Sequence, residues 1–133
     1  MTWNRFARLH ALVETELAKA LQRGHELGLS EYRALERLGE APGGELRMQE
    51  LADALCLNQS SVTRLVGRLE ETGLTRRDLC SADRRGVYSV ITDRGRVRLA
   101  EARSTYERSL AAALEQAGAD PALTPLVTLV RGS

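Results

Sequence analysis

Hydrophobic residues recur at intervals of three and four along the first part of the chain, which is the period of a helix with one buried face. Between residues 3 and 23 this pattern predicts one long helix. A second helix is expected from Ser30, a residue type that often caps a helix N-terminus, to about Glu40. The proline and glycines of residues 41–45 then predict a loop.

Two closely spaced helices are predicted next. The first covers residues 47–57, and the second starts after Asn58, a typical N-cap residue, and continues to Glu71. Gly73 follows, at the place where a glycine commonly ends a helix. The buried stripe of the second helix consists of Val62, Leu65, Val66 and Leu69.

The period changes after Gly73. Residues 74–79 and 87–92 are short segments of strand type, and the polar residues between them predict a turn, so that the two form a β-hairpin. Thr92 is expected to cap a long helix that ends near Ala117, and Asp120 with Pro121 to begin a last short helix. The expected fold class is therefore mostly α with a small β-hairpin.

The most specific pattern is the segment LADALCLNQSSVTRLVGRLE at residues 51–70. Ala52 lets two helices approach closely, Cys56 falls at the turn, and Val62 with Leu65 anchors the second helix on the first; these are the offsets of a helix-turn-helix. Together with the hairpin it predicts a winged helix. The outer face of the second helix is then available to a DNA major groove, and it carries Asn58, Gln59, Ser60, Ser61, Thr63, Arg64 and Arg68.

The distribution of charge agrees with a DNA-binding surface. The net charge of the 133 residues is only +1, but residues 58–98 hold nine arginines against five acidic residues, a local charge of +4. A basic segment in a nearly neutral chain is a candidate contact for a polyanion. Because the sequence has neither an apolar run of about 20 residues nor a signal-peptide pattern, we expect a cytoplasmic protein with no membrane partner.

The predicted hairpin tip concentrates charge in the segment CSADRRG, residues 80–86. Arg84 and Arg85 would reach the adjacent minor groove, whose negative potential is strongest over narrow A·T-rich steps. Asp83 would pair with one of them and hold the turn. The alternative is a surface hairpin whose charges have no binding role.

The sequence resembles the MarR family of bacterial winged-helix regulators over almost its whole length. The resemblance rests on LSEYRALERLGEAPGGELRMQELADAL, on SSVTRLVGRLEETGLTRR and above all on SADRRGVYSVITDRG. It implies a homodimer whose terminal helices interlock and whose two winged-helix lobes bind successive major grooves of a near-palindromic operator, commonly as a repressor. By position it implies DNA contacts from Ser60, Ser61, Thr63 and Arg64 in the recognition helix and from Arg77, Asp83, Arg84 and Arg85 in the wing.

Three segments are therefore expected. Residues 29–95 would form the winged helix-turn-helix DNA-binding domain, and residues 1–28 and 96–133 the N- and C-terminal dimerisation helices. The dimer is also favoured independently, because the apolar surface of the terminal segments exceeds what a chain of this size covers alone. Half-sites about 10 bp apart would match the two-fold symmetry of such a dimer.

Two modes of sensing remain open from the sequence, because the family implies release by a small aromatic acid or by thiol oxidation. An effector pocket would be lined by Trp3, Arg8, His10 and Tyr32, with Arg8 binding the acid; alternatively, Trp3 and His10 pack in the dimer core. The redox candidate is Cys80, because neighbouring arginines favour the reactive thiolate. Cys56 is interpreted as a structural turn residue.

Other functional classes find little support in the sequence. It shows no nucleophile–base–acid set and no phosphate-binding glycine loop, and we expect neither an enzyme nor a cofactor. Two separated cysteines with His10 and His25 are too few for a structural zinc site, so no metal is expected. A winged helix that docks a protein in place of DNA is the remaining alternative.

Overall fold

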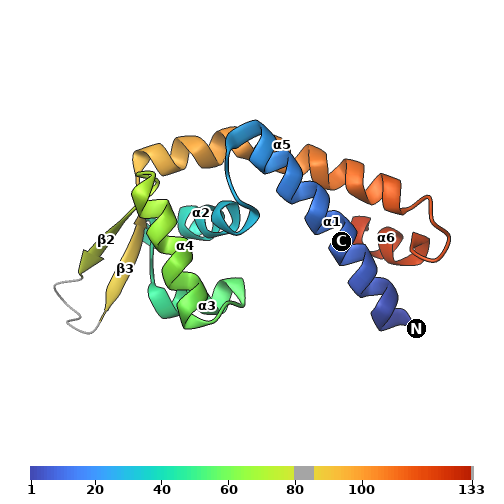
Figure 1. Ribbon diagram of the computed structural model, residues 1–133, viewed down its shortest axis with the longest axis horizontal. Coiled ribbons are helices and arrows are strands. Elements are labelled where there is room, and N and C mark those ends of the chain that lie inside the picture. The colour runs from blue at the N-terminus through green and yellow to red at the C-terminus, as the bar shows by residue number, and fades with distance from the viewer. Residues whose placement is uncertain (80–85, 133) are drawn as a thin grey trace. The chain divides into compact units, whose positions relative to one another are not determined.

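The computed structural model describes residues 1–79 and 86–132, which form a mostly helical structure with a small antiparallel sheet of three strands (Figure 1). This confirms the expected fold class. The helices are α1 (Thr2–His25), α2 (Leu29–Glu40), α3 (Met48–Leu55), α4 (Gln59–Glu71), α5 (Asp93–Ala117) and α6 (Thr124–Arg131), with a short 3-10 helix at Pro42–Gly44. The strands are β1 (Glu45–Arg47), β2 (Thr75–Leu79) and β3 (Val87–Ile91).

The chain divides into two compact units. The first, called here the winged-helix unit, is Ser30–Glu101. The second, called the helical unit, combines Met1–Leu29 with Ala102–Ser133. Because α5 runs from Asp93 to Ala117, this one helix begins in the winged-helix unit and ends in the helical unit.

The core of the winged-helix unit is made by the inner faces of its helices. In α4, the predicted stripe of Val62, Leu65, Val66 and Leu69 is completely buried, which confirms the sequence-based assignment of its inner face. Leucines of α2 and α3 are buried in the same unit, and α4 contacts both α3 and β2. The strands β2 and β3 extend beside α4 (Figure 1), so the polar face of the helix and the wing belong to one compact unit.

The sheet has the strand order β1-β3-β2, with β3 paired antiparallel to both neighbours. The predicted hairpin corresponds to β2 and β3. Strand β1 corrects the sequence prediction, which placed residues 41–45 in a loop and began a helix at residue 47. Residues Glu45–Arg47 instead pair with β3, and Arg47 lies opposite Tyr88. The paired residues are more than 40 positions apart in the sequence, so no local pattern reveals the pairing.

Two helix starts also differ from the predicted ones. Helix α2 begins at Leu29, so Ser30 lies within its first turn and is not the N-cap. Helix α6 begins at Thr124, later than predicted. The carboxylate of Asp120 accepts a hydrogen bond from the backbone N–H of Ala122 at 2.9 Å, which favours a turn before the helix.

Thr92 joins three elements at the start of α5. Its hydroxyl donates to the carbonyl oxygen of Gly73 at 2.7 Å and accepts from the backbone N–H of Gly95 at 3.0 Å, which confirms it as a capping residue. Gly73 has a φ of 75° after the end of α4, as predicted for a terminating glycine. At Gly95, a Cβ atom would collide with the carbonyl oxygen of Leu74, so only glycine fits this close approach of α5 to the backbone just before β2.

The helical unit has a smaller apolar cluster. Leu9 of α1 packs there with residues of the α5 end and of α6, and the buried members are Leu9, Leu114, Ala117, Leu123 and Val127. Several large apolar side chains of the same unit remain exposed, namely Met1, Trp3, Phe6, Leu12, Leu129 and Val130. The unit therefore presents apolar surface in addition to its own core.

Candidate nucleic-acid interface

A tight turn connects α3 to α4. Cys56 adopts a left-handed conformation with φ 56°, and its backbone N–H and that of Leu57 donate to carbonyl groups at the end of α3. Asn58 caps α4, since its side-chain oxygen accepts from the backbone N–H of Ser61 at 2.8 Å and from the hydroxyl of Ser60 at 3.0 Å. The structure thus confirms Cys56 as the turn residue and fixes the direction of α4.

The outer face of α4 is polar along its length. Gln59, Ser60, Thr63, Arg64 and Arg68 are exposed, and Ser61 is half-buried. The Thr63 hydroxyl donates to the carbonyl oxygen of Gln59 at 2.8 Å, and the Arg64 guanidinium lies 3.5 Å from the hydroxyl of Ser61. The first turn has no acidic side chain, so the end of the helix that carries these hydrogen-bonding groups favours an anionic partner.

An ion pair attaches the wing to this helix. Arg77 of β2 donates through Nε to the carboxylate of Glu70 in α4 at 3.1 Å, and both side chains are partly exposed. Exposed pairs of this kind contribute little stability, about 0–1 kcal/mol, but they fix geometry. Arg77 therefore lies at the root of the wing. Cys80, Asp83, Arg84 and Arg85, the remaining wing residues singled out from the sequence, lie outside the described residues.

Sequence reasoning missed two side chains beside the wing. Arg47 of β1 donates through Nε to the hydroxyl of Tyr88 in β3 at 3.1 Å, and its guanidinium carbon lies 5.7 Å from the centre of the Tyr88 ring. The contact combines a hydrogen bond with a cation–π interaction. It follows from the pairing of β1 with β3, which the sequence pattern did not indicate.

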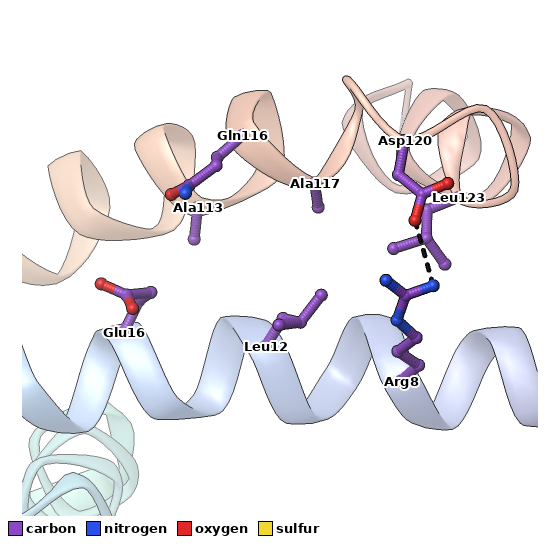
Figure 2. A pocket seen from close by; sticks show the side chains of 8 residues that line it. All are labelled: Arg8, Leu12, Glu16, Ala113, Gln116, Ala117, Asp120 and Leu123. Carbon is purple, nitrogen blue, oxygen red and sulfur yellow. Dashed lines mark ion pairs between the residues drawn. The ribbon is translucent and has the colours of Figure 1, made fainter.

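A separate cavity of about 240 Å³ lies within the helical unit, between α1 and the end of α5 (Figure 2). Its walls combine apolar and charged side chains: Arg8, Leu12, Glu16, Ala113, Gln116, Ala117, Asp120 and Leu123. Arg8 points across it to Asp120, and their nitrogen and oxygen atoms are 3.0 Å apart. Glu16 also lines the cavity, so the cavity wall contains two carboxylates, of Glu16 and Asp120, and one guanidinium, of Arg8.

The other members of the predicted effector pocket lie elsewhere. Trp3 and His10 lie on the exposed face of α1, where the rings of Trp3, Phe6 and His10 stack in a row with centroids 5.9 and 6.4 Å apart. His10 also lies 2.9 Å from the carboxylate of Glu14. Tyr32 is buried in the winged-helix unit, with its hydroxyl 3.4 Å from Glu36. The cavity of Figure 2 thus contains Arg8 without the other three.

Across residues 1–79 and 86–132, no three histidine, cysteine or acidic side chains are grouped as metal ligands. Among the helices in those same residues, none combines the length and the apolar character that crossing a membrane requires.

Known structures resemble this chain over nearly all of its length. At 28% identity, the MarR family transcriptional regulator Sco3205 from Streptomyces coelicolor, solved in complex with DNA, matches with a TM-score of 0.82 over 98% of this chain and 81% of that one. AbsC, a MarR family transcriptional regulator of the same organism, matches at 27% identity with a TM-score of 0.79, covering 99% of this chain and 93% of its own.

A third structure is the MarR family protein Rv2887 from Mycobacterium tuberculosis in complex with salicylic acid. It is 25% identical and has a TM-score of 0.67, covering 84% of this chain and 80% of that one. The MarR family model itself matches residues 27–87, which include the helix-turn-helix and the first part of the hairpin. The resemblance stated from the sequence is confirmed: this chain is similar to winged-helix transcriptional regulators of the MarR family.

Proposed function

We propose that the protein is a sequence-specific transcriptional regulator, a repressor that binds a near-palindromic operator as a homodimer and is released by a small-molecule effector. The observation that carries this proposal is the exposed polar face of α4 on a helix whose opposite face is completely buried. A helix held in this way can enter a major groove, which is about 12 Å wide. The DNA complex of the similar Sco3205 regulator supports the same partner.

The side chains of α4 supply the chemistry of base and phosphate recognition. Arg64 can bind guanine and Gln59 adenine through two hydrogen bonds each. Ser60, Ser61, Thr63 and Arg68 add donors for phosphates, while Asn58 holds the end of the helix. In the wing, Arg84 and Arg85 would enter the minor groove beside Asp83, and Arg77 would orient them from the root.

Selection of duplexes from a random DNA library, at near-physiological salt, tests sequence specificity. We expect a two-fold symmetric motif with half-sites about 10 bp apart. Arg64→Ala should then reduce the preference for this motif over a scrambled duplex by about tenfold or more, if the arginine reads a base edge. Arg37→Ala, which removes an exposed arginine at the end of α2, is the matched control and should leave the preference unchanged.

The protein-docking alternative gives a different result. A folded dimer that enriches no sequence, and whose binding to DNA is unaffected by Arg64→Ala and Arg85→Ala, would contradict a DNA-binding function. The winged helix would then be assigned to a protein partner. If Arg85→Ala weakens DNA binding and lowers the slope of log K against log salt concentration by about one unit, the wing contacts a phosphate-rich groove.

The terminal segments, residues 1–28 and 96–133, would provide the dimer interface. The support is the exposed apolar surface of the helical unit, including the row of Trp3 and Phe6 on α1 and the side chains of Leu129 and Val130 on α6. Patches of this kind on a protein surface usually mark an interface. Light scattering should give the mass of a dimer at micromolar concentration, and a monomer alone would contradict the proposal.

An acidic effector in the cavity of Figure 2 would have to compete with the Asp120 carboxylate for Arg8, because these two side chains are already paired. Salicylic acid, the ligand of the similar Rv2887 structure, is a suitable probe. Asp120→Asn should strengthen salicylate binding by removing the competing carboxylate, as measured by the shift of the melting temperature. If salicylate shifts neither the wild type nor this variant, the cavity is not an acid-binding site.

Thiol oxidation is the alternative mode of release. DNA binding measured before and after mild peroxide separates it from ligand binding. Loss of binding that Cys80→Ser prevents would assign sensing to the wing. Cys56→Ser is the comparison, since this exposed thiol lies in the turn between α3 and α4.

A further inference from the structure

A cavity of about 370 Å³ lies in the winged-helix unit between the start of α4 and the start of β3, at the outer end of the described part of the hairpin. It is formed where α3 begins, where α4 begins and where β3 begins, and its lining residues are Arg47, Met48, Gln49, Gln59, Gly86 and Val87. Only Gln59 belongs to the predicted recognition face of α4. The other lining residues therefore form a surface to which no role has yet been assigned.

The polar groups at this cavity are mainly hydrogen-bond donors. Arg47 contributes a guanidinium, and Gln59 contributes a side-chain amide at the first position of α4. Two helices begin here, and the first N–H groups of a helix carry partial positive charge. Nearby acids reduce this charge in part, because the Glu50 carboxylate accepts from the backbone N–H of Arg47 at 2.9 Å and the Asp53 carboxylate accepts from the Gln49 amide at 2.8 Å.

The sheet holds the guanidinium of Arg47 in a defined position. Arg47 lies directly opposite Tyr88 in the β1–β3 pairing, and both the hydrogen bond of 3.1 Å and the ring contact of 5.7 Å join the two side chains. An arginine that is already ordered loses less conformational entropy when it binds a ligand. Its planar group of several N–H donors matches two oxygens of a phosphate.

The position of the cavity indicates which phosphate it would meet. If α4 occupies a major groove and the wing the adjacent minor groove, one sugar–phosphate strand separates the two grooves. That strand must pass between the N-terminus of α4 and the outer part of the wing, where Gln59 and Val87 line the cavity. We propose that this cavity binds a phosphodiester of the DNA backbone, with Arg47 as the principal ligand, Gln59 as a second donor and Tyr88 as a positioning residue.

This inference rests on the proposed function, and salt dependence tests it directly. Each neutralised phosphate contributes about 0.9 to the slope of log K against log salt concentration. Arg47→Ala should lower that slope by about 0.9 and weaken binding to the selected operator and to a scrambled duplex by a similar factor, about tenfold, because a phosphate carries no sequence information. Arg37→Ala is again the control and should change neither quantity.

A second variant separates positioning from charge. Tyr88→Phe keeps the ring but removes the hydroxyl that accepts from Arg47, so the charge count, and with it the salt slope, should remain the same. The affinity should fall about threefold because the guanidinium is less ordered before binding. A merely structural role of the hydroxyl would lower the melting temperature without this loss of affinity in the folded protein.

Neutral methylphosphonates, placed one at a time along the operator, identify the phosphate itself. In the wild type, one position on each half-site should weaken binding about tenfold, and in Arg47→Ala the same position should have no further effect. Equal losses at every position in both proteins, together with an unchanged salt slope, would overturn the phosphate site while DNA binding stands. Failure of the wild type to bind any duplex would instead overturn the proposed function and this site together.

Discussion

In the winged-helix unit, the large side chains on the inner faces of α2, α3 and α4 are almost completely buried, whereas the helical unit leaves several of its largest side chains exposed. Leu35, Leu38 and Leu65 are at most 1% exposed, but Trp3 and Leu129 are 69% and 72% exposed. The winged-helix unit is not free of exposed apolar residues, since Leu79 and Val97 are also exposed. These two lie on different elements, β2 and α5, however, while the exposed residues of the helical unit include neighbouring aromatic rings on α1.

The comparison shows that the core of the winged-helix unit is well buried, whereas the helical unit has a smaller core and leaves apolar side chains exposed. The winged-helix unit can fix its own fold, because sheet and helices bury a continuous set of leucines and valines. In the helical unit, two long helices and one short helix bury one face and present another. The difference predicts that mutations in the two units act on different equilibria, folding in one and association in the other.

The largest effect on stability is expected from a substitution in the core of the winged-helix unit. Leu65→Ala removes a fully buried side chain of α4 and leaves a cavity, so the free energy of unfolding should fall by about 3 kcal/mol. Denaturant titration measures this loss. The matched control is Leu79→Ala at an exposed position, for which a change beyond about 0.5 kcal/mol would contradict the assignment of these two side chains to core and surface.

The next effect concerns association. Trp3→Ala should raise the dissociation constant of the proposed dimer by about tenfold or more, since a large aromatic anchor would be lost from each of its two protomers. Analytical ultracentrifugation over a range of concentrations measures it. The melting temperature of the winged-helix unit should change little. If the variant dimerises as tightly as the wild type, the exposed row on α1 does not belong to the interface.

A smaller loss of stability is expected at Thr92, which caps α5. Thr92→Val keeps the shape of the side chain but removes the hydroxyl that bonds to Gly73 and Gly95, and it should cost about 1–2 kcal/mol of folding free energy. Thr92→Ser restores the hydroxyl and is expected to recover most of the loss. Equal stability of the valine variant and the wild type, in thermal or denaturant unfolding, would show that the two hydrogen bonds are not needed.

Local signals explain what could be predicted from the sequence. The limits of α4 were predicted because Asn58, the apolar stripe and Gly73 all lie within or next to the helix itself. The start of α5 was predicted for the same reason, from Thr92. Each of these features depends on neighbours in sequence, where capping and helical period have direct physical meaning.

Long-range pairing explains what could not be predicted. Strand β1 is three residues long and forms only through its partner β3. The contacts of Arg47 with Tyr88 and of Arg77 with Glu70 therefore had no sequence signal. The effector pocket was predicted from residue types alone, and the structure pairs Arg8 with Asp120, a residue 112 positions away that the sequence pattern assigned to a helix start.

Helix α5 runs without interruption through the boundary between the two units, from Asp93 to Ala117. An α-helix turns by about 100° for each residue, so the number of residues between two positions of α5 sets the angle between their side chains around the helix axis. Deletion of one residue near Ala102 would turn every later side chain of α5 by about that angle relative to the earlier ones, so the buried side chains of Leu99 and Leu114 would no longer keep the angle between them along the helix. In evolutionary terms, insertions and deletions in this helix should be excluded more strictly than substitutions on its exposed face.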